Sequence, residues 1–400
     1  MPTPIRLLTF STLYPNSMQP NHGVFVENRL RHLLASGEAT SVVLAPVPFY
    51  PDAPGFRALG RKRGWDKMAQ VPAQESRHGF AVHHPRYLTI PGIGMNLAPD
   101  LLYRTALAAA RRLMAQGVTF DLIDAHYVYP DGVAAVRLGQ ALGKPVVITG
   151  RGSDLTELPD YPVPRRKIID TLARANGLIT VSAALGEAMV ALGADRAKLS
   201  VLRNGIDTMM FRPMEREAAR AAFGVAGRVL LSVGHLIPRK GHDRTIQALA
   251  QLPEYTLLIA GDGPERASLQ ALAERLGVSS RLRLLGALPH GMLAQLYSAA
   301  DAMLLSSSRE GWANVLLESM ACGTPVVASN IPGNPEVVQR AEAGLIVREN
   351  TAEGIAEGVQ ALFAALPDRA ATRAYAEPFS WDATTQGQLA LFRRVLGRDA

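Results

Sequence analysis

The sequence predicts an α/β protein built from two doubly wound domains, each with a parallel sheet. Short apolar runs alternate with amphipathic runs along almost the whole chain, and this pattern restarts after Asn204. That alternation is typical of a parallel sheet covered by helices on both faces. With 48% hydrophobic and only 19% charged residues, the 400-residue chain has enough apolar material for two cores and is not intrinsically disordered.

The expected strands of the first half are short, continuous apolar runs, as in strands buried on both faces. They lie at 5–10, 41–45, 81–85, 122–125, 146–149 and 177–181. Between them, apolar residues recur every three or four positions, which predicts helices. These helices are expected at 24–35, 97–116, 132–142 and 165–175.

The second half repeats the same alternation. Its expected strands lie at 228–233, 256–260, 282–285, 302–305 and 325–328, and its expected helices at 242–251, 265–276, 290–299, 313–322 and 336–340. An isolated amphipathic helix is expected at 379–396. The pattern places the boundary between 185 and 210, and it predicts domains at 1–190 and 200–375, followed by a separate segment at 376–400.

The net charge of +7 lies entirely in the first half. Residues 1–200 carry 22 Lys and Arg against 15 Asp and Glu, whereas residues 201–400 carry 20 of each. A basic half can face nucleic acid, anionic lipid or a phosphorylated substrate. The single cysteine, Cys322, excludes an intramolecular disulfide and favours a reducing compartment. There is neither a long apolar span nor a signal-peptide pattern, so we expect a cytoplasmic protein.

Two glutamates, Glu310 and Glu318, flank the start of an expected helix just after the strand at 302–305. Gly311 allows a ligand to approach the backbone, and the first N–H groups of the helix favour an anionic or polar ligand. Glu318 lies about one turn into the helix, from where it could reach the same ligand from a second side. In isolation, two glutamates eight residues apart are also common on a solvated surface.

A basic turn at 234–241 follows the strand at 228–233 and precedes a helix. Arg239 and Lys240 are placed there for phosphate binding. The turn is not a Walker A loop, because Lys240 is followed by Gly241 in place of Ser or Thr. A solvated basic turn is the alternative interpretation.

Three further turns follow expected strands or join the two domains. His126 directly follows the strand at 122–125, and Asp154 is the last residue of the glycine-rich turn at 149–154. Asn204 is the first residue of an Asn-Gly turn at the domain boundary. The sequence contains no Asp-x-Asp pair, so a carboxylate site for a metal–nucleotide complex is not evident. The Gly261–Gly263 turn lacks the third glycine of a dinucleotide fingerprint, where Arg266 stands.

Taken together and in order, these residues resemble the family 4 retaining glycosyltransferases of the GT-B fold, over nearly the whole chain. The resemblance implies two Rossmann-like domains facing an interdomain cleft, with the helix after 376 crossing back onto the first domain. Its markers are the E-x7-E pair Glu310 and Glu318, the phosphate loop Gly234–Gly241, the Asn204–Asp207 segment, His126, the 151–154 turn and the 379–381 tail.

The resemblance also implies roles for these residues. Glu318 would bind the ribose hydroxyls, Glu310 would hold the donor sugar, and Lys240 would neutralise the diphosphate in place of a metal. His126 would lie beside the anomeric carbon. The other expected donor contacts are Gly311, Trp312, Ala313, Asn314, Gly234, His235, Arg239, Asn204, Asp154 and Gly23, the last in a loop that closes over the diphosphate. No cofactor, metal or protein nucleophile is expected, and His235 departs from the family, which usually has Arg there.

The expected function is retaining transfer of a sugar from a UDP- or GDP-sugar to a glycan or lipid-linked acceptor in bacterial cell-surface polysaccharide synthesis. The alternatives are a GT-B epimerase or phosphorylase, or a non-catalytic nucleotide-sugar-binding protein; nucleic acid is not an expected partner. The segment 56–67 is either a solvated loop or a contact to an anionic membrane on its inner face. Its cations are Arg57, Arg61, Lys62, Arg63 and Lys67.

Overall fold

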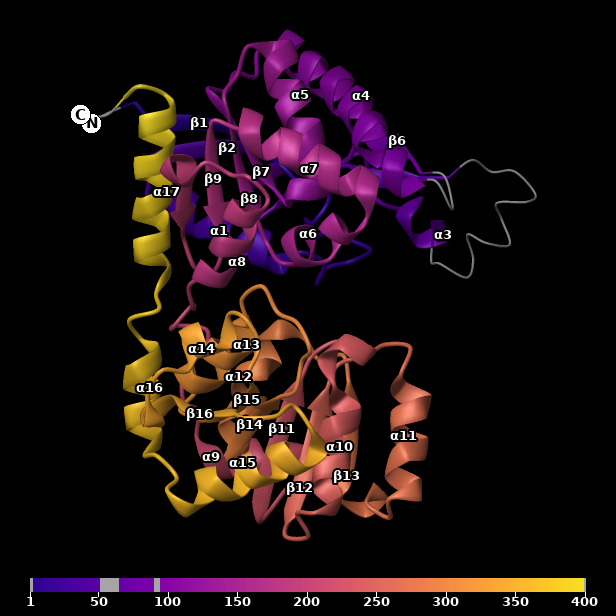
Figure 1. Cartoon of the computed structure of the whole chain (residues 1–400), viewed down its shortest axis with the longest axis vertical. Helices are drawn as coiled ribbons and strands as arrows, with labels where there is room; N and C mark the ends of the chain where they lie inside the picture. Colours follow the sequence, from indigo (N-terminus) through magenta and orange to yellow (C-terminus); the bar gives the residue numbers. More distant parts are fainter. Residues whose placement is uncertain (1–2, 51–64, 90–93, 399–400) are drawn as a thin grey trace. The chain divides into compact units, whose positions relative to one another are not determined.

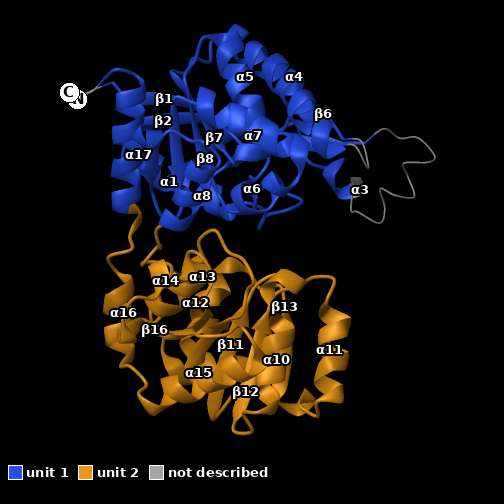
Figure 2. Cartoon of the chain, in the orientation of Figure 1, with its two compact units in different colours: residues 1–204, 382–400 blue, residues 205–381 orange. Residues whose placement is uncertain are grey.

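A computed structural model describes residues 3–50, 65–89 and 94–398 of the chain. The chain forms two compact units (Figure 2). Unit 1 contains residues 1–204 and also 382–400, and unit 2 contains residues 205–381. The chain therefore passes from unit 1 to unit 2 and then returns to unit 1.

Unit 1 is built on an eight-stranded sheet with the order β10-β9-β8-β7-β1-β2-β5-β4. All neighbouring strands are parallel except the edge pair β4 and β5. Its strands are β1 (Ile5–Phe10), β2 (Ala39–Leu44), β4 (Gln74–Arg77), β5 (Phe80–His83), β7 (Leu122–His126), β8 (Val146–Gly150), β9 (Gly177–Thr180) and β10 (Leu199–Val201). A separate parallel pair consists of β3 (Val47–Phe49) and β6 (Arg86–Leu88).

Helices cover both faces of this sheet (Figure 1). The α-helices of unit 1 in the described residues are α1 (Val24–Ala35), α3 (Trp65–Met68), α4 (Gly94–Ala115), α5 (Val133–Leu142), α6 (Ser153–Thr156), α7 (Pro162–Arg174), α8 (Ala183–Ala191) and α17 (Trp381–Val395). Helices α4, α5 and α7 pack on one another, and α5 lies on β7 and β8.

The returning helix α17 is part of the unit 1 core. Its Leu389 and Phe392 are fully buried and share one apolar cluster with Val26 and Leu30 of α1 and with sheet residues such as Leu7. This burial explains the amphipathic pattern of the last helix, because its apolar face completes a core made by residues far away in the sequence.

Unit 2 is built on a six-stranded parallel sheet with the order β13-β12-β11-β14-β15-β16. Its strands are β11 (Arg228–Val233), β12 (Tyr255–Ala260), β13 (Leu282–Gly286), β14 (Ala302–Leu305), β15 (Val326–Ser329) and β16 (Gly344–Val347). Its helices are α9 (Arg216–Phe223), α10 (His242–Ala250), α11 (Arg266–Arg275), α12 (His290–Ala299), α13 (Asn314–Ala321), α14 (Asn334–Val337), α15 (Ala352–Ala364) and α16 (Arg369–Ala376).

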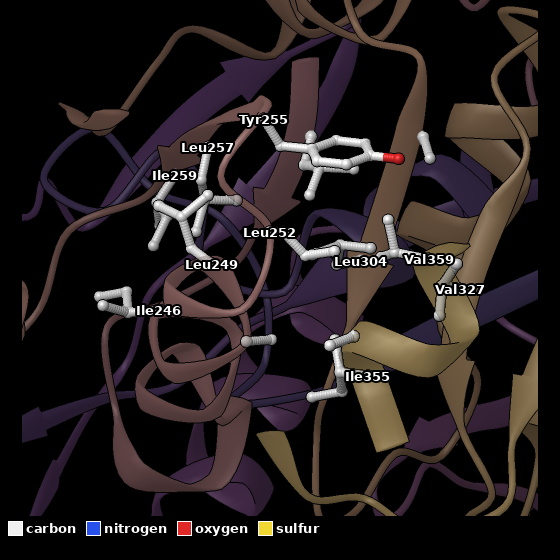
Figure 3. Close-up of a cluster of buried hydrophobic side chains, with 14 of the residues drawn as sticks. Ile246, Leu249, Leu252, Tyr255, Leu257, Ile259, Leu304, Val327, Ile355 and Val359 are labelled. Carbon is white, nitrogen blue, oxygen red and sulfur yellow. The ribbon is translucent and has the colours of Figure 1, made fainter. Parts of the chain in front are cut away.

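One apolar core of unit 2 lies between the sheet and the helices α10, α11 and α15 (Figure 3). Leu249 of α10 and Ile355 of α15 pack against strand residues such as Leu257 and Leu304. Helices α12 and α13 lie with α9 and α16, and α13 contacts β14 and β15. The sheet is therefore doubly wound, as the sequence predicts.

In both units the first strand lies inside the sheet, and the strand order reverses beside it. This switch lies between β1 and β7 in unit 1 and between β11 and β14 in unit 2. Open α/β sheets bind ligands outside the carboxyl ends of the strands at such a switch. The segments that matter for function are therefore the ones that follow these four strands.

Candidate functional site

The loops after β11 and β14 meet at the switch point of unit 2. The Lys240 Nζ lies 2.5 Å from the Glu310 Oε1, and the Ser307 hydroxyl donates to the same oxygen at 2.6 Å. The Arg239 Nη1 lies 3.8 Å from the other carboxylate oxygen. Two cations and one carboxylate, all expected from the sequence, therefore gather at one edge of the sheet.

Close backbone contacts explain the glycines of the basic loop. Gly241 has a φ of +66°, and a Cβ there would lie 2.2 Å from the Ser306 carbonyl oxygen. The Ser306 hydroxyl in turn donates to the Gly241 carbonyl at 2.6 Å. A Cβ at Gly261 would lie 1.8 Å from the Gly234 carbonyl oxygen. The Gly261–Gly263 turn thus has a packing role, and the stem of Lys240 lies over Gly234.

His235 uses one ring nitrogen inside the protein. Its Nδ1 lies 2.7 Å from the Asp262 carbonyl oxygen, which can only accept, so Nδ1 carries the proton. The ring is otherwise exposed. In the neutral form its Nε2 is therefore a hydrogen-bond acceptor, and only the imidazolium could donate to a phosphate there.

Glu318 is held by an aromatic cluster from helix α12 and the segment before α9. The Tyr297 hydroxyl donates to the Glu318 Oε2 at 2.9 Å, and the His290 Nε2 lies 3.7 Å from Oε1. The neighbouring Glu318 carboxylate raises the pKa of His290, against the effect of burial. The Phe211 ring meets His290 and Tyr297 edge-on, with centroid distances of 5.1 and 6.1 Å. The sequence pattern did not single out any of these three aromatic residues.

The residues between the two glutamates form the turn into α13. Trp312 and Ala313 are buried, Gly311 is half-buried, and the helix begins at Asn314. Glu318 follows one turn later and remains 8% exposed. The strand, glycine turn and helix that the sequence predicts here are thus all present.

In unit 1, His126 lies in a buried polar network. Its Nε2 is 3.2 Å from the Asp124 Oδ2, and the Arg151 Nη2 donates to its Nδ1 at 2.7 Å. Arg151 also donates through Nη1 to the Asn204 Oδ1 at 3.1 Å. The His126 ring is 1% exposed, and burial lowers its pKa. Both ring nitrogens have partners within the protein, so a contact to a sugar requires that one of them be exchanged.

Asp154 is fully buried and binds backbone. Its carboxylate accepts from the N–H groups of Val128, Arg151 and Gly152, at 2.8, 3.0 and 2.7 Å. Burial raises the pKa of Asp154 although these three donors oppose the shift. In this geometry Asp154 shapes the turn after β8, and the expected donor contact stays a prediction.

The loop between β1 and α1 is fixed at both ends. Gly23 has a φ of +70°, and a Cβ there would lie 2.3 Å from the Leu13 carbonyl oxygen. Asp131 accepts from the Thr12 backbone N–H and, at 3.0 Å, from the Thr12 hydroxyl. Burial raises the pKa of Asp131 to about 7. The sequence pattern did not single out Asp131, although this residue lies in the turn that follows His126.

The remaining expectations concern the basic segment and metals. Arg57, Arg61, Lys62 and Arg63 lie outside the described residues, and Lys67 is exposed in α3. Within the described ranges, no group of three or more His, Cys, Asp or Glu residues could hold a metal ion. None of the helices in those ranges is long and apolar enough to cross a membrane.

Two known families match the chain, one on each unit. Residues 23–209 match the family described as Glycosyltransferase Family 4, and residues 215–378 match the family described as Glycosyl transferases group 1. A D-inositol 3-phosphate glycosyltransferase from Mycobacterium leprae (strain Br4923) is 36% identical over 246 residues, which cover 58% of this chain and 55% of that one. The enzyme of the same name from Mycobacterium bovis (strain BCG / Pasteur 1173P2) is 37% identical over 220 residues, covering 51% and 45%. The matched region thus spans about half the length of these relatives.

Solved structures share the fold over nearly the whole chain. Sucrose-phosphate synthase from Thermosynechococcus elongatus has a TM-score of 0.78 at 19% identity, and the alignment covers 99% of this chain and 100% of that one. Anabaena HepE in complex with UDP and glucose has a TM-score of 0.73 at 20% identity, with 98% and 100% covered. These likenesses establish the architecture of two Rossmann-like units of the GT-B type.

Proposed function

Because the chain belongs to the family 4 glycosyltransferases of the GT-B fold, we propose that it transfers a sugar from a nucleoside-diphosphate sugar to an acceptor hydroxyl. The observation that carries this proposal is the arrangement of Lys240 and Arg239 around Glu310 at the switch point of unit 2. It combines a compact positive charge with a carboxylate at the edge where such sheets bind nucleotides.

In the proposed reaction, the acceptor oxygen bonds to the anomeric carbon on the face from which the diphosphate leaves, so the configuration is retained. The bond between the sugar and the diphosphate breaks, and the proton of the acceptor hydroxyl passes to the leaving diphosphate. The negative charge that develops on the leaving diphosphate is stabilised by Lys240 and Arg239, without the need for a metal. Glu310 orients the hydroxyls of the donor sugar. Glu318, fixed by Tyr297, accepts hydrogen bonds from the ribose hydroxyls.

A UDP-sugar is the first donor to test, because the related HepE structure holds UDP and glucose. Two acceptor classes follow from the comparisons and the sequence. One is a glycan or lipid-linked acceptor of bacterial cell-surface polysaccharides. The other is a phosphorylated small alcohol, the class in the name of the matching inositol 3-phosphate enzymes. The positive charge of the first half suits either an anionic lipid or a phosphorylated acceptor.

A thermal-shift screen of nucleoside diphosphates and their sugars identifies the donor, since a ligand that binds only the folded state raises the melting temperature. Turnover is then followed by NMR, which reports the anomeric configuration of the product. A new α- or β-linkage that matches the donor supports retaining transfer, and an inverted linkage contradicts it.

Incubation without acceptor detects an epimerase, and incubation with inorganic phosphate detects a phosphorylase. Binding without turnover of any donor favours a non-catalytic nucleotide-sugar protein.

We also propose that the protein works in the cytoplasm and contacts an anionic membrane through the basic segment 56–67. Co-sedimentation with vesicles of anionic and of neutral lipid tests this contact. The triple variant Arg61→Ala, Lys62→Ala, Arg63→Ala should lose binding to the anionic vesicles only. Unchanged binding would leave the solvated loop as the interpretation of this segment.

A further inference from the structure

His126 is contacted at both ring nitrogens by groups whose hydrogen-bonding roles are fixed by their chemistry. The guanidinium of Arg151 has donors and no acceptor, so the Nδ1 that it meets at 2.7 Å must carry a lone pair. The ionised carboxylate of Asp124 only accepts, so the Nε2 at 3.2 Å from it carries the proton. Asp124 and His126 are two positions apart on β7, so their side chains lie on one face of the sheet.

Only one of the three protonation states of the ring fits these partners. Both the imidazolium and the Nδ1–H tautomer would direct an N–H group at an N–H group of Arg151. The surrounding charges act in the same direction, because the guanidiniums of Arg151 and Arg29 both oppose a positive charge on the ring. Asp124 favours that charge, and although burial raises the pKa of Asp124, the charges of Arg29 and Arg151 help to keep its carboxylate ionised.

Arg151 is itself held in place. Its Nη1 donates to Asn204, its backbone N–H donates to Asp154, and its guanidinium lies 5.2 Å from the centre of the Phe25 ring. The side chain is buried, so its position does not depend on solvent. The Ser11 hydroxyl fixes the strand end from the other side by donating to the His126 carbonyl at 3.1 Å.

We propose that Arg151 is a positioning residue that locks His126 as the neutral Nε2–H tautomer across the pH range in which the protein is folded. The ring then takes no part in proton transfer, and a contact to the sugar would have to replace Asp124 at Nε2 or Arg151 at Nδ1. This consequence for sugar transfer rests on the proposed function, whereas the lock itself is a property of the folded chain.

NMR of the full chain labelled with ¹⁵N-histidine tests the lock directly. The protein has nine histidines, and the His126→Gln variant identifies the signals of this ring. In the wild type we expect the pattern of a protonated Nε2 and an unprotonated Nδ1, unchanged from pH 5.5 to 8.5. A His126 signal that titrates in this range, or that shows the opposite tautomer, overturns the proposal.

The Arg151→Met variant removes the donor and its charge but keeps Asp124. Its His126 ring should then gain a proton at Nδ1 as the pH falls, because the remaining carboxylate stabilises the imidazolium. Arg174→Met is the matched control, since Arg174 is an exposed arginine of the same unit, paired with Asp170. If the His126 signals of Arg151→Met equal those of the wild type, Arg151 does not fix the tautomer of His126.

Arg151→Lys keeps the test decisive if the methionine variant does not fold. A lysine keeps the charge but cannot bond Nδ1 and Asn204 in the same geometry. We therefore expect the Nδ1 signal to move in Arg151→Lys and to stay in Arg174→Met. An unmoved signal in Arg151→Lys contradicts the proposed contact.

The dependence of kcat/KM on pH tests whether the fixed neutral tautomer of His126 affects the reaction. In the wild type, kcat/KM should show no fall at low pH that is caused by protonation of His126. In Arg151→Met, kcat/KM should fall at the pH where the His126 NMR signal of that variant titrates. An acidic limb in the wild type that disappears in His126→Gln contradicts the proposal. A protein that turns over no donor refutes the proposed function and leaves the NMR result standing.

Discussion

Lys240 and Glu310, seventy residues apart, form an ion pair across the carboxyl ends of two neighbouring parallel strands, with Nζ 2.5 Å from Oε1. The pair is largely buried, with 16% of the lysine and 10% of the glutamate side chain exposed. Replacing either residue therefore removes the opposite charge beside its partner. The pair therefore couples the loop expected to bind phosphate to the loop expected to bind the donor sugar.

Lys240→Met should reduce sugar transfer by ~10²- to 10³-fold, because it removes a preorganised charge at the leaving diphosphate. The protein should stay folded, since Ser307 and Arg239 still face Glu310. Turnover is measured with the donor found by thermal shift, and the fold by circular dichroism. Arg275→Met, at an exposed position of α11, is the control and should keep full activity. Wild-type turnover in Lys240→Met would remove Lys240 from the site.

Glu318→Gln should weaken binding of UDP by ~10- to 100-fold, because hydrogen bonds to charged groups contribute about 1.5–3 kcal/mol. The amide keeps the size of the side chain and can still accept from Tyr297. Calorimetry with UDP and with its 2′,3′-dideoxy analogue separates a ribose contact from a general effect. The analogue should bind both proteins almost equally. An equal loss for both ligands would argue against a ribose contact, and Glu274→Gln, at an exposed position, is the control.

Gly23→Ala should destabilise unit 1 more than Gly37→Ala. Both glycines have left-handed backbone, with φ of +70° and +75°, so both substitutions cost about 1–2 kcal/mol for that conformation. Only at Gly23 would the new Cβ lie 2.3 Å from the Leu13 carbonyl oxygen, whereas nothing lies within 4 Å at Gly37. Urea unfolding of both variants measures the difference. Equal losses of stability would mean that the loop before α1 relaxes freely.

Asp131→Asn should change how stability depends on pH. The pKa of the folded carboxyl is raised from an ordinary 3.8 to about 7, so the folded state holds this proton more tightly than the unfolded state. The stability contributed by the group is full at low pH and is lost as the pH rises through about 7. In the asparagine variant the amide oxygen can still accept from the Thr12 backbone N–H and the amide nitrogen can donate to the Thr12 hydroxyl oxygen, but the side chain does not titrate.

The stability of the wild type relative to Asp131→Asn should therefore fall by up to ~1.4 kcal/mol per pH unit between the two pKa values and level off above them. Urea unfolding from pH 4.5 to 8.5 gives both curves, and groups shared by the two proteins cancel in their difference. Parallel curves would show that Asp131 has an ordinary pKa.

Phe392→Ala should destabilise unit 1 by about 3–5 kcal/mol, because a fully buried aromatic ring is replaced by a cavity. Hydrogen exchange localises the effect, and protection should fall in β1 before it falls in β11. Met209→Ala, at a side chain that is 76% exposed in unit 2, should change little. Equal loss of protection in both units would show that the two unfold together.

The strands in the sheet centres could be predicted from the sequence, and so could the edge strand β13, whereas the edge strands β4, β10 and β16 could not. β1, β11 and β14 have the expected bounds, because each is a short and mostly apolar run that ends at a loop. β4 was missed because all four of its residues are polar and its place depends on pairing with β5. The expected elements also left out β16, α15 and α16, although β16 and α15 are apolar.

In the candidate site, too, residues could be predicted from the local sequence pattern but not from contacts that only the packing creates. Glu310, Glu318 and Lys240 could be found because each follows a strand, a glycine turn or both. Phe211 and Tyr297 could not, because their contact with the residues around Glu318 arises only when α12 and α13 pack together. Sequence alone also left open how far His126 is buried, since its partner Arg151, and the Asn204 side chain to which Arg151 donates, come from distant turns.

The return of the chain to unit 1 has a consequence for synthesis on the ribosome. Residues 205–381 form one continuous unit, so unit 2 has all of its segments once residue 381 has left the ribosome. Unit 1 has most of its sheet far earlier, but Leu389 and Phe392 of its core are made only after the whole of unit 2. During that interval the apolar surface that α17 later covers is open to water and to other chains, which is a condition that favours aggregation. The unit that is translated first is therefore the one that is completed last.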